Sequence, residues 1–225
     1  MNFVLFHIGD TTLPDLLAKS IRKFSPNSLI YFVTDNATKK IDDADHCVTI
    51  NGDPEKIMTF RLKAYSEIKL KEHAIYLDTD MLMLKSYNFK EFEKFDIALC
   101  SREFGNDAKI NENYKNQNWS NYSGKSAGEV FPYVACFSIT KDYLFWKDCY
   151  NELLKLDEKF HYWYGDQEVM RLLLETKNYH FSKIKEGTMC PPLEYLKEDS
   201  IFAHFKGGRK NQMEEAAKFI LSNKY

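Results

Sequence analysis

Two aspartates, Asp78 and Asp80, are separated by one threonine and lie between two apolar runs, 74–77 and 81–84. Both runs favour buried strands. In an extended strand residues i and i+2 point to the same side, so we expect the two carboxylates to converge at a strand end. Adjacent like charges are costly to bury unpaired, whereas carboxylate oxygens are good ligands for a hard divalent cation. The pattern therefore predicts a cation that bridges the acids to phosphate oxygens.

A second group of polar residues follows the apolar segment 201–203 and reads His-Phe-Lys-Gly-Gly-Arg-Lys over 204–210. Glycine allows close backbone approach to a ligand, lysine is a usual partner of phosphate, and imidazole suits metals such as Mn²⁺. By itself the segment is more typical of a solvated basic turn. Because the acid pair needs a third protein ligand, we interpret His204 as that ligand.

A third group, Tyr-Trp-Tyr-Gly-Asp-Gln-Glu, occupies 162–168. Aromatic rings can stack on sugars, and a carboxylate beside an amide, Asp166 and Gln167, can orient hydroxyl groups. The same pattern also predicts a helix capped by Asp166 after core aromatics. The other histidines have no partner spacing and are interpreted as structural or exposed: His7, His46, His73, His161 and His180.

Bulk properties narrow the class of protein. The net charge of −2 argues against a dedicated nucleic-acid binder. No signal peptide is evident, and no apolar stretch is long enough to span a bilayer. The five cysteines are odd in number and scattered, which favours reduced thiols. We therefore expect a cytoplasmic protein with one domain of ordinary size.

Strand and helix patterns alternate in the first half of the chain. Thr12 with Asp15 forms a candidate capping box for the first helix, and Asp53-Pro54 is a typical helix start. The expected strands are 3–7, 28–33, 46–50 and 74–77. This order predicts an α/β fold with a mainly parallel central sheet and helices on both faces. Ligands of such sheets gather at the carboxyl ends of the strands, where Asp78 and Asp80 fall.

The second half is less regular. The polar stretch 104–128 is longer than an ordinary loop, and we expect a functional lid or a disordered segment. The remaining strands are predicted at about 96–100, 134–140, 180–184 and 201–204, with helices at about 146–154, 166–176 and from 212 onward.

These residues, taken in order, resemble the GT-A glycosyltransferases of family 8, the glycogenin and galactosyltransferase group. The resemblance covers most of the chain through the strand end at 3–10, Arg61-Leu62, the run from Ile75 to Asp80, Asp166-Gln167, and His-x-x-Gly-x-x-Lys at 204, 207 and 210. The chain departs from the family where Tyr133-Val134-Ala135-Cys136 replaces an Asn-x-Gly element. It departs again where Asn211-Gln212 replaces Pro-Trp.

The resemblance implies a single GT-A (Rossmann-like) domain over 1–225, with a nucleotide-binding half at about 1–103 and a sugar and acceptor half at about 104–225. It implies a hexosyltransferase that moves a sugar, with retention, from a UDP-sugar to a glycan, lipid-linked or protein acceptor. It also implies a set of site residues. Mn²⁺ or Mg²⁺ would be bound by Asp78, Asp80 and His204. Asp166 and Gln167 would lie beside the transferred sugar. The residues expected to contact the nucleotide-sugar are Phe6, Ile8, Gly9, Arg61, Thr79, Gly207 and Lys210.

Three alternatives remain at this stage. A catalytically inactive protein of the same fold would bind nucleotide-sugar or carbohydrate without turnover. A haloacid dehalogenase-type phosphohydrolase also uses Asp-x-Asp, but at the end of its first strand. A sugar nucleotidyltransferase requires a glycine-rich basic loop after the first strand, which Gly9-Asp10-Thr11-Thr12 does not provide.

Overall fold

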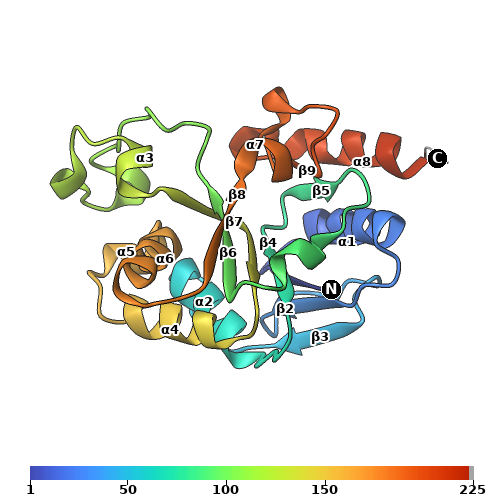
Figure 1. Ribbon diagram of the computed structural model, residues 1–225, viewed down its shortest axis with the longest axis horizontal. Coiled ribbons are helices and arrows are strands. Elements are labelled where there is room, and N and C mark those ends of the chain that lie inside the picture. Colours follow the sequence, from blue (N-terminus) through green and yellow to red (C-terminus); the bar gives the residue numbers. More distant parts are fainter. Residues whose placement is uncertain (223–225) are drawn as a thin grey trace.

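A seven-stranded sheet forms the centre of the computed structural model, which describes residues 1–222 (Figure 1). Its strand order is β3-β2-β1-β4-β7-β6-β8. The strands are β1 (Asn2–Phe6), β2 (Ile30–Thr34), β3 (His46–Thr49), β4 (Ala74–Leu77), β6 (Ile97–Ser101), β7 (Tyr133–Thr140) and β8 (Phe181–Lys185). Strands β1 to β4 run parallel, and β7 runs antiparallel to both β4 and β6. The predicted α/β fold with a mostly parallel sheet is confirmed.

Helices cover both faces of the sheet, as Figure 1 shows. One face packs against α1 (Thr12–Phe24) and α8 (Met213–Ser222), and the other packs against α2 (Ile57–Glu67), α4 (Leu144–Leu153) and α6 (Gly165–Thr176). Because both faces are covered, β1 and β4 are buried throughout and read as continuous apolar runs. Within residues 1–222, no helix combines the length and apolar character that crossing a bilayer requires.

A second, two-stranded sheet lies over the α1 side of the molecule. It pairs β5 (Met81–Met83) antiparallel with β9 (Phe202–His204), with Met81 opposite His204. The shorter helical segments are α3 (Ala127–Val130), α5 (Lys159–Tyr162), α7 (Glu186–Met189), η1 (Phe89–Phe92), η2 (Tyr114–Asn116), η3 (Ser120–Tyr122), η4 (Leu193–Tyr195) and η5 (Gly207–Gln212). The β5–β9 pairing joins the segment after the acid pair to the segment that contains His204.

Three predicted helix caps were wrong. Helix α1 has no side-chain cap at Thr11, and Asp10 instead accepts the N–H of Thr12 at 3.0 Å. Helix α2 begins at Ile57 because Asp53 accepts the N–H of Glu55 at 2.9 Å, which closes a local turn. Helix α6 begins at Gly165, so Asp166 lies in its first turn and does not cap it. For α1 and α2, a short local hydrogen bond to an aspartate replaced the expected cap.

The polar segment 104–128 is folded against the rest of the protein. Trp119 is fully buried, and its indole N–H donates to the carbonyl of Tyr114 at 3.0 Å. A capping box at Ser126 and Glu129 begins α3. The polar composition of the segment led to the expectation of a lid or a disordered segment, because a single buried tryptophan anchors a stretch that is otherwise polar.

Candidate active site at the end of strand β4

Asp78, Thr79 and Asp80 form the turn between β4 and β5. The backbone N–H of Asp78 donates to the carbonyl of Cys136 at 2.9 Å, which extends the pairing of β4 with β7 by one residue. The carbonyl of Asp80 accepts the N–H of Phe205 at 2.8 Å. The turn is therefore held on one side by the central sheet and on the other by the segment that follows β9.

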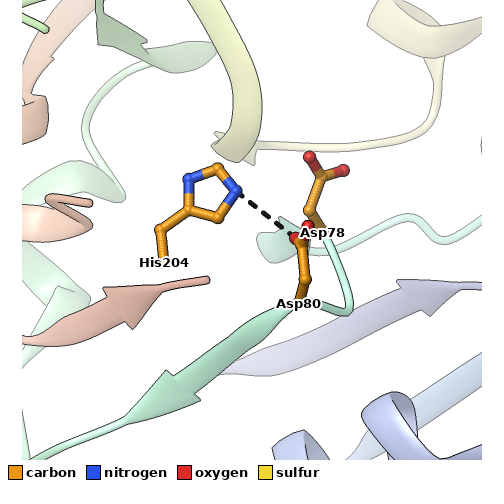
Figure 2. A group of neighbouring side chains, drawn as sticks. All are labelled: Asp78, Asp80 and His204. Carbon is orange, nitrogen blue, oxygen red and sulfur yellow. Dashed lines mark ion pairs between the residues drawn. The ribbon is translucent and has the colours of Figure 1, made fainter. Parts of the chain in front are cut away.

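His204 comes to the acid pair from the far end of the chain. Its Nε2 atom lies 3.3 Å from Oδ1 of Asp80, and the residue is only 4% exposed. One ligand atom from each of Asp78, Asp80 and His204 lies within 4.8 Å of the other two. Figure 2 shows the imidazole turned toward the two carboxylates. The structure brings together the three residues that the sequence analysis singled out as metal ligands.

Basic side chains contact the same carboxylates. Nζ of Lys210 lies 3.1 Å from Oδ2 of Asp80. The guanidinium of Arg61 contacts Asp78 at 2.7 Å through Nη1 and contacts Asp166 through Nη2. Asp166 is 1% exposed, so its charge is compensated largely by Arg61. Arg61 thus connects the acid pair to the start of α6.

The pKa values of Asp78 and Asp80 are shifted in opposite directions. Burial raises the pKa of the Asp78 carboxyl, and the neighbouring Asp80 charge adds to this effect against the opposing charge of Arg61. Burial also acts to raise the pKa of Asp80, but His204 and Lys210 outweigh it and hold that pKa below its usual value. A carboxyl with a raised pKa beside one with a lowered pKa indicates two carboxylates held close together.

The donor set fits a divalent cation. Two carboxylates and one imidazole supply oxygen and nitrogen ligands of the kind that Mn²⁺ accepts, and Mg²⁺ would take the carboxylates. A cation between them would also relieve the repulsion between Asp78 and Asp80.

The cluster formed by Asp78, Asp80 and His204 opens into a cavity of about 720 Å³. Of the residues proposed from sequence, eleven line it: Phe6, Ile8, Arg61, Asp78, Thr79, Asp80, Asp166, Gln167, His204, Gly207 and Lys210. Gly9 is adjacent in sequence but does not line the cavity; it adopts φ +97°, and its N–H donates to Thr38 at 2.7 Å. Gly207 adopts φ +68°, and open space would surround an added Cβ, so a ligand can approach its backbone closely.

Several cavity residues were not identified from sequence. His7, interpreted as structural or exposed, lines the cavity, and its Nδ1 lies 2.8 Å from the hydroxyl of Thr79. Its place directly after the first strand was the available signal. Arg102, at the end of β6, lines the cavity and donates to the side-chain oxygen of Gln167. Tyr114 and Lys115 bring the 104–128 segment to the same cavity.

Comparison with solved structures identifies the fold. No protein-family model and no curated protein matches the chain. The crystal structure of the galactosyltransferase LgtC in complex with donor and acceptor sugar analogs has a TM-score of 0.59 at 13% identity, covering 100% of this chain and 98% of that one. An LgtC active-site mutant in which glutamate replaces glutamine has the same TM-score and identity, covering 97% and 96%. The chain therefore has the GT-A fold of these structures.

Proposed function

We propose that this chain is a metal-dependent glycosyltransferase that moves a hexose, with retention, from a UDP-sugar to a hydroxyl acceptor. The observation that carries the proposal is the convergence of Asp78, Asp80 and His204 within 4.8 Å beside a cavity that Lys210 also lines. The GT-A fold, shared with a galactosyltransferase over the full chain length, supports the same activity. The residue types at the site therefore match the chemistry that the fold commonly hosts.

Asp78, Asp80 and His204 would hold Mn²⁺ or Mg²⁺, which supplies charge stabilisation for the departing diphosphate. Lys210 adds a cation to the same diphosphate, and the Gly207 backbone lets the phosphate oxygens come close. Phe6 and Ile8, with Arg61 and Thr79, would contact the nucleoside, in the half formed by about 1–103, whereas Gly9 would act only through the backbone turn beside them. Asp166 and Gln167 would orient the transferred sugar. A glycan, lipid-linked or protein acceptor would enter along the half formed by about 104–225.

The direct test is a screen of nucleotide-sugars with and without Mn²⁺. We expect a UDP-sugar to raise the melting temperature only when the cation is present, because a ligand that binds the native state stabilises it. We also expect slow release of UDP in the presence of Mn²⁺ that stops when EDTA is added. Cation-dependent binding without any turnover of donor, with or without an acceptor panel, would instead identify an inactive binding protein.

A further inference from the structure

The side chains that line the cavity carry more positive charge than the proposed cation and a bound diphosphate would neutralise. Five basic side chains line it, Arg61, Arg102, Lys115, Lys206 and Lys210, against three carboxylates, Asp78, Asp80 and Asp166. A divalent cation and the two negative charges of a nucleotide-sugar diphosphate offset each other. The basic excess therefore remains when both are bound, which favours a further anionic group among the substrates.

Arg102 is the basic residue to which this excess can be assigned. Arg61 contacts Asp78 and Asp166, and Lys210 contacts Asp80. Arg102 instead donates to two neutral oxygens: Nε–H to the carbonyl of Phe131 at 2.8 Å, and Nη2–H to the amide oxygen of Gln167. Within residues 1–222, Arg102 has no carboxylate at ion-pair distance, and its Nη1 group has no hydrogen-bond acceptor.

Glu186 is the acidic residue whose charge acts most strongly on Arg102, but its carboxylate is hydrogen-bonded to backbone groups instead. Glu186, which is 1% exposed, accepts the backbone N–H groups of Glu103 and Phe104 at 2.7 and 3.1 Å through one carboxylate oxygen. Burial lowers the pKa of Arg102, and the Glu186 charge only partly opposes that effect. A partly buried guanidinium without a contacting counter-ion is costly, and a bound anion would remove the cost.

The contact between Arg102 and Gln167 indicates which substrate carries the anion. Gln167 is proposed above to orient the transferred sugar. Arg102 donates to its amide oxygen, and both residues line the cavity, so a sugar that contacts Gln167 also lies near the Arg102 guanidinium. The planar guanidinium matches a carboxylate through two parallel hydrogen bonds. We propose that Arg102 binds a carboxylate on the transferred sugar, so that the donor is a nucleotide-linked uronic acid. The proposal rests on the glycosyltransferase function and narrows its donor.

The test compares UDP-glucuronate and UDP-galacturonate with UDP-glucose and UDP-galactose in Mn²⁺-dependent donor hydrolysis and transfer. We expect the wild-type chain to have a higher kcat/KM for a uronate donor. Arg102→Ala should lower that kcat/KM about ten- to hundredfold, the scale of a lost charge-assisted contact, and change the value for neutral donors less than about threefold. Arg102→Lys should restore part of the uronate activity, because it keeps the charge but loses the planar fork.

Lys115→Ala is the matched control. It removes one positive charge from the same cavity at a residue whose Nζ lies over the Trp163 ring, 5.0 Å from its centroid. It should change uronate and neutral donors by the same small factor. UDP affinity, measured without sugar, should stay within about threefold of wild type in every variant, which also shows that the variants are folded.

Three results would overturn the proposal. Preference of the wild-type chain for neutral donors would exclude a carboxylate subsite. An equal loss for both donor classes in Arg102→Ala would mean that Arg102 acts only by positioning Gln167. An effect of Arg102→Ala on anionic acceptors alone would place the anion on the acceptor. Failure of every UDP-sugar to bind would instead reject the proposed glycosyltransferase function itself.

Discussion

His204 Nε2 lies 3.3 Å from Oδ1 of Asp80, although His204 is the last residue of β9 and Asp80 lies in the β4–β5 turn, more than a hundred residues earlier in the chain. Asp80 therefore contacts both the imidazole of His204 and the ammonium group of Lys210, and it is also one of the three candidate metal ligands.

Because Asp80 makes all of these contacts, Asp80→Asn should abolish Mn²⁺-dependent UDP binding, a loss of more than about a hundredfold. Calorimetric titration of UDP with and without Mn²⁺ measures it. Asp107→Asn, at an exposed carboxylate, should bind as wild type; normal binding by Asp80→Asn would reject the site.

Lys210 is expected to contribute to diphosphate binding through charge. Lys210→Ala should weaken UDP binding by about 1–3 kcal/mol, the usual contribution of a charge-assisted hydrogen bond. Arg209→Ala is the control, because it removes the same charge one residue away, where Arg209 pairs with Glu194. If both variants bound UDP equally well, the 204–210 segment would be no more than a basic turn.

Metal binding should depend on pH through His204. Burial alone would lower the pKa of its imidazole, but the Cys136 sulfur and the Asp80 carboxylate outweigh burial and raise that pKa above its ordinary value. The imidazole therefore keeps its proton to higher pH than a free histidine does, and a cation that binds Nε2 must displace that proton. Mn²⁺ affinity should rise with pH from about 6 to 8, by up to about tenfold per unit for one displaced proton. Isothermal titration calorimetry in buffers of different ionisation enthalpy measures the number of protons released. An Mn²⁺ affinity that did not change with pH would contradict the proposed displacement of the His204 proton. His180→Gln should keep the wild-type slope.

Arg61 pairs with the buried carboxylate of Asp166 and with the partly exposed carboxylate of Asp78. Arg61→Met should lower the free energy of unfolding by about 3–5 kcal/mol, the usual cost of breaking a buried pair. Urea denaturation measures it. Adding Asp166→Asn should recover part of the loss, because one of the stranded charges is then removed. Lys19→Met, which breaks an exposed pair with Asp15, should lower the free energy of unfolding by less than about 1 kcal/mol. If Arg61→Met and Lys19→Met lowered stability equally, Arg61 would not have the stabilising role expected here.

Trp119 should anchor the 104–128 segment. Trp119→Ala should cost about 3–5 kcal/mol of stability, the scale for truncating a buried aromatic residue, as measured by thermal and urea unfolding. Limited proteolysis should then cut within the segment. Trp163→Ala, at a half-buried ring, should cost less. An unchanged midpoint for Trp119→Ala would show that the segment is held by other contacts.

The sequence was sufficient for those features that local patterns determine. Continuous apolar runs identified β1 and β4, and alternating helices placed the acid pair at a strand end. The pairing of β9 with β5 depends on long-range hydrogen bonds, so His204 could be connected to Asp80 only through the need of the acid pair for a third ligand and through motif resemblance. His7 and Arg102 were missed, because a single residue next to a strand end has no periodicity, and only the sheet order brings the ends of β1 and β6 to one cavity. Helix starts failed where Asp10 and Asp53 closed local turns.

The pairing of β5 with β9 has a consequence for how the proposed cation site forms. A chain still emerging from the ribosome can display both aspartates long before the imidazole has been synthesised. Until residue 204 is available and has paired with Met81, the carboxylates lack their nitrogen partner and the strand that fixes their turn. The complete set of three candidate ligands therefore forms only after residue 204 has been synthesised and β9 has paired with β5.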